Sequence, residues 1–151
     1  MTGLEKTWDG LPIAPEPPHA CCVVVWRKGE RGREFLLLHR VAPRGAGYEG
    51  DWAWTPPSDA RLPGETPDAA AARELREETN LSLDLIALRE AAPSEDVALY
   101  VAEAPLDAEV VLDHEHDRIL WLPLEESGRK CLPPVVGAGL VNASAWLDAN
   151  G

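Results

Sequence analysis

The chain has 151 residues, with 14 Lys and Arg against 26 Asp and Glu, so its formal net charge is -12. This length is typical of one domain with its own hydrophobic core. The acidic balance argues against nonspecific binding to nucleic acid or to anionic membranes, because both favour basic surfaces. A small anionic substrate stays possible, since a bound metal ion can reverse the local field.

No apolar run approaches the length of a membrane span, and the first residues lack a signal-peptide pattern. The three cysteines do not make a complete disulfide framework, and none has zinc-site spacing. We therefore expect reduced cysteines in a cytoplasmic protein. Cys21 and Cys22 are adjacent in a predicted strand, so their side chains should point to opposite faces of a sheet.

Residues 1–18 contain four prolines and little hydrophobic periodicity. We predict an extended strap or tail there, followed by a single domain over residues 19–151. The apolar runs Ala20–Trp26 and Glu34–His39 predict two strands that pair as a hairpin, because a polar, glycine-containing turn separates them.

A short strand is predicted at Trp52–Thr55, between loops at Val41–Gly50 and Ser58–Gly64. A helix should then begin after Thr66, which can cap it, and end at Asn80, which tolerates the left-handed conformation. The remaining predicted elements are strands at Leu83–Leu88, Val97–Ala102 and Arg118–Leu122 and an amphipathic helix at Val135–Asp148. This mixture predicts an α/β sandwich with a mixed sheet.

The predicted central helix carries three carboxylates, Glu74, Glu77 and Glu78, at spacings that share one helix face. Like charges at these spacings repel each other. The cluster is therefore either fully hydrated or neutralised by cations. Hard divalent cations prefer oxygen ligands, and Mg²⁺ usually bridges a few carboxylates to substrate phosphates.

These residues resemble the Nudix box, which reads G-x5-E-x7-R-E-U-x-E-E-x-G-U with U an aliphatic residue. Glu65 and the run Arg73–Thr79 match it directly, and Leu81 fills the last aliphatic place. Asp59 and Asn80 stand where the pattern has its two glycines, and both residue types tolerate positive φ. The resemblance covers about Ala20 to Leu147 and implies a Nudix-type α/β/α sandwich with a mixed central sheet.

The resemblance also implies a hydrolase that cleaves the pyrophosphate linkage of a nucleoside diphosphate derivative by water attack, with Mg²⁺ or Mn²⁺. Carried over by position, Glu74 and Glu78 are metal ligands, and Glu77 is either a ligand or the base that activates water. Arg73 would pair with Glu65 or with Glu77 and orient the carboxylates.

Several further residues are weaker candidates. Asp59 could add a metal ligand or only tune charge. Glu115 could act as a base or metal ligand, although a solvated loop explains it equally well. Arg40 and Arg44 could contact substrate phosphates.

Aromatic residues near the box, Tyr48, Trp52 and Trp54, could stack on a base, although packing roles are commoner. His39, His114 and His116 are expected to be structural or solvated. His114 and His116 lie among acids but lack a metal-ligand spacing, and His39 ends a predicted strand.

Two rival functions remain open from the residues. One is a Nudix-fold nucleotide-binding or regulatory module without turnover, motivated by Asp59 and Asn80. The other is an isomerase-type relative, for which the chain has no clear feature. The expected partner is a small nucleoside diphosphate derivative, not nucleic acid or a membrane, and a homodimer is possible from the family resemblance.

Overall fold

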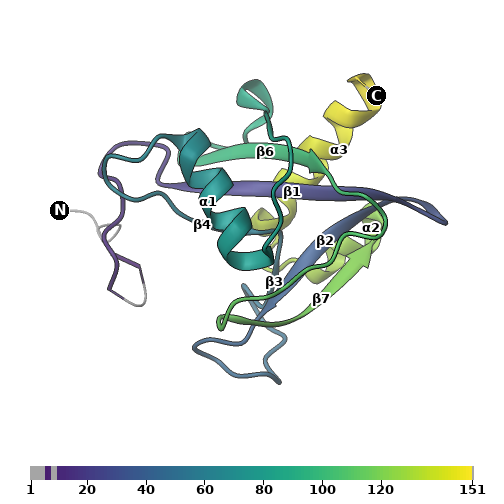
Figure 1. Cartoon of the computed structure of the whole chain (residues 1–151), viewed down its shortest axis with the longest axis horizontal. Helices are drawn as coiled ribbons and strands as arrows, with labels where there is room; N and C mark the ends of the chain where they lie inside the picture. The colour runs from purple at the N-terminus through teal and green to yellow at the C-terminus, as the bar shows by residue number, and fades with distance from the viewer. Residues whose placement is uncertain (1–5, 8–9, 151) are drawn as a thin grey trace.

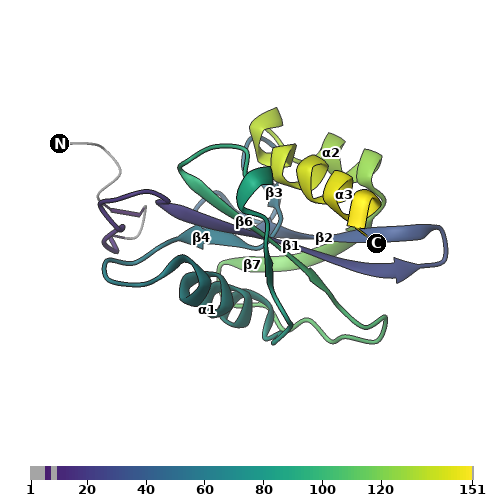
Figure 2. The ribbon, with the colours of Figure 1, turned by 90° about the horizontal axis from the view of Figure 1, so that it is seen from above.

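The computed structural model describes residues 6–7 and 10–150. In this part of the chain, seven strands form one mixed sheet, with α1 on one face and α2 and α3 on the other (Figure 1 and Figure 2). The strands are β1 Ala20–Gly29, β2 Gly32–Arg40, β3 Trp54–Thr55, β4 Ser58–Ala60, β5 Ile86–Ala87, β6 Val97–Glu103 and β7 His116–Leu122. The helices are α1 Pro67–Thr79, α2 Leu124–Lys130 and α3 Ala138–Asn150, with 3₁₀ turns at Arg89–Ala91 and Pro134–Gly137. The predicted α/β/α architecture is confirmed.

Strand β1 is the centre of the sheet. It pairs antiparallel with β2 and β4 and parallel with β6. The predicted β1–β2 hairpin is confirmed, and Gly32 adopts a φ of +100° where the second strand begins. Strands β3 and β7 pair with β2, and β5 pairs with β6.

The side chains of β1 alternate between two cores. Cys21, Val23 and Val25 pack in the cluster that contains the α1 residues, whereas Cys22 and Val24 pack in the cluster that contains α3. The predicted opposition of Cys21 and Cys22 is therefore confirmed. All three cysteines are free and buried. Burial of each strand valine stabilises the fold by roughly 1.5–3 kcal/mol.

Helix α1 has the end signals that the sequence predicts. The Thr66 side chain accepts a hydrogen bond from the Ala69 N–H at 3.1 Å, and Pro67 occupies the first turn. At the other end Asn80 has a φ of 62°, and its N–H donates to the Arg76 carbonyl at 2.9 Å. The asparagine thus closes the helix in the left-handed conformation.

The predicted bounds of several strands and loops were wrong, because pairing with strands distant in the sequence outweighed the local sequence pattern. The predicted loop at Ser58–Gly64 begins with strand β4, in which Asp59 pairs with Cys21 of β1. Asp59 adopts no positive φ, so its tolerance of that conformation is not used. The predicted strand Leu83–Leu88 is paired only at Ile86–Ala87.

Three other differences concern short elements. The predicted strand Trp52–Thr55 is reduced to β3, since Trp52 has a φ of 66° that an extended strand cannot contain. The predicted C-terminal helix begins with a 3₁₀ turn, and regular α-helix starts at Ala138. Helix α2 was not predicted, because its polar sequence LEESGRK lacks an apolar period.

Of the predicted strap at residues 1–18, residues 1–5 and 8–9 lie outside the described part of the chain. The rest lies against the segment that joins β4 to α1, with the Ala14 N–H donating to the Arg61 carbonyl at 2.7 Å. Among the described helices, none is long and apolar enough to cross a membrane.

Candidate active site

Helix α1 divides the three predicted glutamates between two environments. Glu74 and Glu78 lie one turn apart on the face that packs on the sheet, with exposures of 0% and 2%. The neighbouring buried residues Ala70, Ala71 and Leu75 hold this face against β1. The Glu77 side chain instead is 56% exposed. The cluster is therefore a buried pair with a third carboxylate at its edge.

The Glu74 carboxylate is both buried and unpartnered. Among the described residues, no group forms a hydrogen bond with either of its oxygens. Glu78 has one such contact, because its Oε1 accepts from the Ser58 N–H at 3.2 Å. A buried carboxylate without partners is costly when ionised, so it requires a proton or a cation.

Burial raises the pKa of Glu74 well above its ordinary value, and the nearby Glu78 charge raises it further. Burial likewise raises the pKa of Glu78, and Asp59 on β4 adds to that shift. Each carboxylate therefore disfavours ionisation of the next. Shifts of this kind are typical of functional sites.

The donor set fits a hard divalent cation, because Glu74 offers two free oxygens and Glu78 and Asp59 carry neighbouring carboxylates. As the described side chains stand, no group of three His, Cys, Asp or Glu is close enough to hold a metal ion. A cation here would therefore need side-chain rotation or further ligands from water, main chain or phosphate. Mg²⁺ sites commonly combine one or two carboxylates with waters and substrate oxygens.

Arg73 joins the box carboxylates to β4. Its guanidinium binds Glu65 through two hydrogen bonds of 2.7 and 3.0 Å and donates to Glu77 at 3.2 Å. It also donates to the Ala60 carbonyl at 3.1 Å. The Arg73 hydrogen bonds hold the pKa of Glu65 below its usual range. The two pairings left open by the sequence thus occur together.

A cavity of about 420 Å³ opens beside this arginine, and we call it the acidic pocket. Asp59, Arg73 and Glu77 line it from the box side. Residues 113–115 line it from the loop before β7. Glu115 is thus brought to the site, where its carboxylate pairs with Arg40 at 3.4 Å.

Asp113 also lines this pocket, and sequence reasoning missed it as a candidate. Its charge contributes to the raised pKa of Glu78. The buried His116 holds it through a contact of 2.7 Å between Nδ1 and the Asp113 carboxylate. The Val111 N–H donates to the Thr79 carbonyl at 3.0 Å, which docks the loop on the end of α1. The Asp-x-x-His spacing of Asp113 and His116 was visible in the sequence. That Asp113 lies close to α1 in the fold was not.

A second cavity, of about 340 Å³, borders Ser58 and Asp59 of β4, and we call it the apolar cleft. Trp52, Val135 and Val136 line it together with Arg40 and Asp59. Trp52 is 51% exposed and Val135 is 63% exposed. Because Asp59 lines both cavities, they meet at the box.

Three predicted substrate contacts lie elsewhere. Arg44 donates to the Tyr48 hydroxyl at 2.7 Å and stacks on its ring, so the exposed arginine and the partly buried tyrosine bind each other. Neither lines the acidic pocket or the apolar cleft. Trp54 is 3% exposed, and its N–H donates to Glu49. Its burial leaves no free ring face and favours the packing role.

His39 lies against Trp54 in the fold and has a structural role. It is fully buried, with Nδ1 2.6 Å from the Asp117 carboxylate and Nε2 2.6 Å from the Tyr48 carbonyl. These contacts anchor the loop at residues 41–50 to β2 and β7. His114, which the sequence also left as a weak candidate, lines the acidic pocket.

Comparisons with known proteins agree with this geometry. A family model described as "NUDIX domain" matches residues 15–140. An octanoyltransferase of Myxococcus xanthus is 34% identical over 125 residues, which cover 76% of this chain and 34% of that protein. The chain thus spans about a third of the length of that relative.

Two further similarities extend over nearly the whole of the matched protein. An asymmetrical bis(5'-nucleosyl)-tetraphosphatase of Caenorhabditis elegans is 29% identical over 138 residues, which cover 85% of this chain and 95% of that protein. The crystal structure of a C. elegans Ap4A hydrolase binary complex superposes with a TM-score of 0.69 at 28% identity. That similarity covers 86% of this chain and 97% of the other.

Proposed function

Because the chain belongs to the Nudix family, we propose that it is a divalent-metal-dependent pyrophosphohydrolase acting on a nucleoside diphosphate derivative. The observation that carries this proposal is the Glu74 carboxylate, which is fully buried without a partner among the described residues. Retaining such a group reduces stability unless it has a functional ligand. Mg²⁺ or Mn²⁺ is the class of ligand that suits it.

Glu74 and Glu78 are the proposed ligands of the cation, with Asp59 as a further carboxylate beside them. When bound, the cation would neutralise phosphate charge and lower the pKa of a bound water. The buried face of α1, which packs on β1 and β4, fixes the position of both glutamates. A cation held by these two carboxylates would therefore lie beside a phosphate bound at the box.

Glu77 and Glu115 are the candidates for accepting the proton of the attacking water. Both line the acidic pocket. Glu77 pairs with Arg73, and Glu115 pairs with Arg40. Glu77 could instead complete the ligand set. Arg73 keeps Glu77 and Glu65 in place and ties them to β4, which makes it a positioning residue in either case.

The substrate is proposed to extend into both cavities. A base would enter the apolar cleft against Trp52, because an exposed indole offers a stacking surface beside Arg40. The phosphates would cross Asp59 toward the acidic pocket. The likeness to a tetraphosphatase and to an Ap4A hydrolase supports a dinucleoside polyphosphate as the first substrate to examine.

The test is an activity screen with Mg²⁺ and with Mn²⁺ over dinucleoside polyphosphates, nucleoside triphosphates, ADP-sugars and nicotinamide dinucleotides. Glu78→Gln should abolish turnover. Glu125→Gln is the control for loss of a helical carboxylate away from the box, since Glu125 lies on α2 and pairs with Arg129. Nucleotide binding without turnover of any substrate would overturn the hydrolase and favour the binding module.

The binding-module alternative has lost part of its motivation. It rested on Asp59 and Asn80 in place of glycine. Asn80 adopts the left-handed conformation and caps α1, and Asp59 lies in a paired strand. Neither substitution therefore distorts the backbone that presents the carboxylates.

A further inference from the structure

Arg61 fastens the N-terminal segment to the box. It follows β4 directly and is 5% exposed. Its guanidinium donates to the carbonyls of Pro18 at 2.8 Å and Glu16 at 2.7 Å. It also donates to the carbonyl of Glu65 at 2.6 Å. A buried guanidinium with this many directed contacts fixes the relative position of the groups that it joins.

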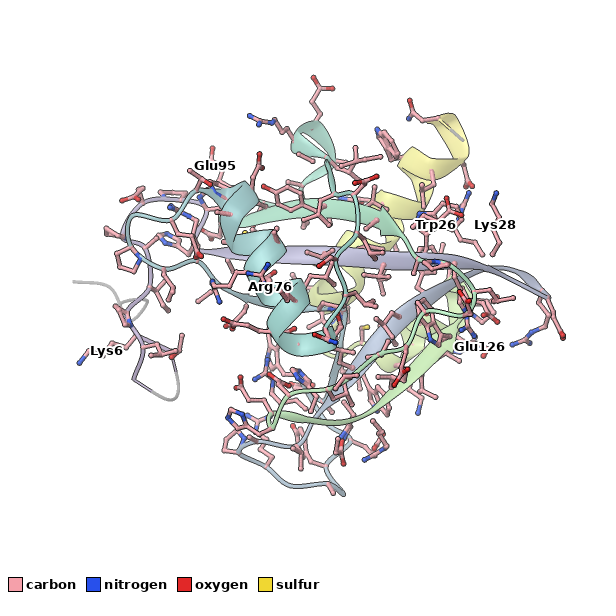
Figure 3. The ribbon with its side chains drawn as sticks, viewed as in Figure 1. Lys6, Trp26, Lys28, Arg76, Glu95 and Glu126 are labelled. Atoms are coloured by element: carbon pink, nitrogen blue, oxygen red, sulfur yellow. The ribbon has the colours of Figure 1, made fainter. Side chains whose placement is uncertain are left out.

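The segment held by Arg61 continues to the acidic pocket. Lys6 pairs with Pro12 across a turn, and its side chain points away from the sheet (Figure 3). Within the turn the Thr7 N–H donates to the Leu11 carbonyl at 2.8 Å, and the Leu11 N–H donates to the Thr7 hydroxyl at 3.0 Å. Thr7 and Leu11 then line the same pocket as Arg73.

Leu11 differs in chemistry from most of that lining. Its side chain is 51% exposed, although it is large and apolar. Among the described lining residues, only Leu11 and Leu62 have large apolar side chains, and charged groups dominate the remainder. A terminal phosphate gains nothing from such a side chain. A nucleoside or other organic group gains burial of apolar area.

We propose that Leu11 is a specificity-determining residue that contacts the organic group on the far side of the cleaved linkage, and that Arg61 is the residue that positions it. This inference rests on the proposed function. The N-terminal segment then selects substrates in which the pyrophosphate joins two organic groups over substrates that end in phosphate. One group occupies the apolar cleft, and the other meets Leu11 in the acidic pocket.

The test measures binding by calorimetry in Mg²⁺, with a methylene-bridged diadenosine tetraphosphate and a methylene-bridged adenosine triphosphate as probes. The wild type should bind the dinucleotide more tightly. Leu11→Ala should reduce that preference about tenfold, as expected for loss of one aliphatic contact. Leu106→Ala is the matched control, because Leu106 is 60% exposed and lines neither cavity.

Arg61→Lys tests the positioning role, since lysine keeps the charge but loses the guanidinium fork. It should reduce the same preference and expose the N-terminal segment to limited proteolysis while the domain still unfolds cooperatively. Leu11→Ala combined with Arg61→Lys should reduce the preference no further than Leu11→Ala alone, because both act through one contact. Full additivity of the two changes would overturn the role of Arg61.

The outcomes separate the two proposals. If the wild type binds neither probe, the proposed function fails and the role of Leu11 fails with it. If the wild type binds both probes equally, or Leu11→Ala weakens both in the same proportion, the role of Leu11 is wrong, while the proposed function still depends on the turnover screen. A preference that falls in Leu11→Ala and not in Leu106→Ala supports the inference.

Discussion

Glu74 and Glu78 lie one turn apart on the buried face of α1, and Glu78 raises the pKa of Glu74. The pair combines desolvation with like-charge repulsion, and both effects destabilise the ionised native state. The same arrangement is suited to hold a divalent cation. Stability without metal and affinity for metal should therefore oppose each other at this pair.

The first prediction concerns metal and stability. Without divalent cations at pH 8, Glu74→Gln should unfold at a temperature no lower than the wild type, because one buried charge has been removed. Millimolar Mg²⁺ should raise the melting temperature of the wild type by several degrees, since a ligand at 100 Kd adds about 2.7 kcal/mol. The variant should show no such rise in differential scanning calorimetry. An equal rise in both proteins would contradict the assignment of Glu74.

The second prediction concerns pH. The pKa of Glu74 lies above its ordinary value of 4.5 in the native state, so the native state binds more protons than the unfolded state above that pH. The free energy of unfolding of the metal-free protein should therefore fall as pH rises from 4.5. Urea titrations in EDTA at pH 5 and pH 8 measure this slope.

The Glu74→Gln variant isolates the part of that slope that depends on Glu74, including its coupling with Glu78. Burial lowers the pKa of His116, which makes the native state more stable as pH rises toward its ordinary value of 6.5. This opposing contribution occurs in both proteins and cancels in their difference. The stability of the wild type relative to Glu74→Gln should fall between pH 5 and pH 8. A constant difference would show that Glu74 has an ordinary pKa.

The third prediction concerns Arg73. Replacement by lysine removes the two-bond contact with Glu65 and the link to the Ala60 carbonyl. We expect kcat to fall about 10- to 100-fold, as is usual when a residue that orients metal ligands is lost. Arg76→Lys is the control, because Arg76 is exposed on the same helix (Figure 3). Steady-state kinetics of both variants would decide whether position 73 is special.

The fourth prediction separates the two roles of Glu77. Glu77→Gln should lower kcat by about 10²-fold or more in either role. If Glu77 is a ligand, Mn²⁺ affinity measured by electron paramagnetic resonance should fall as well. If it is the base, Mn²⁺ affinity should be unchanged, and the acidic limb of the pH–rate profile should disappear. Unchanged kcat would exclude both roles and leave Glu115 as the candidate base.

The fifth prediction concerns the apolar cleft. Trp52→Ala should weaken nucleotide binding by about tenfold, because stacking of a base on an aromatic ring contributes roughly 1–3 kcal/mol. Trp52→Phe should retain most of the affinity. Calorimetric titration with a methylene-bridged nucleotide measures both. Equal binding by wild type and Trp52→Ala would place the base outside the apolar cleft.

The elements that the sequence predicted well are those with local signals. Thr66, Pro67 and Asn80 mark the ends of α1 through contacts within a few residues. The run Ala20–Trp26 is strand-like because β-branched and buried residues dominate it. The elements predicted poorly, β4 and the short β5, exist only through pairing with distant strands.

The sequence by itself determined the box, its spacing and the number of carboxylates on α1, because helical periodicity places residues three and four apart together. Only the tertiary structure decided that Glu74 and Glu78 are buried while Glu77 is exposed, since that depends on which helix face meets β1. It also brought Asp113 and Leu11 to the same pocket from distant segments. Such contacts arise from loop docking and main-chain hydrogen bonds, and no local pattern encodes them.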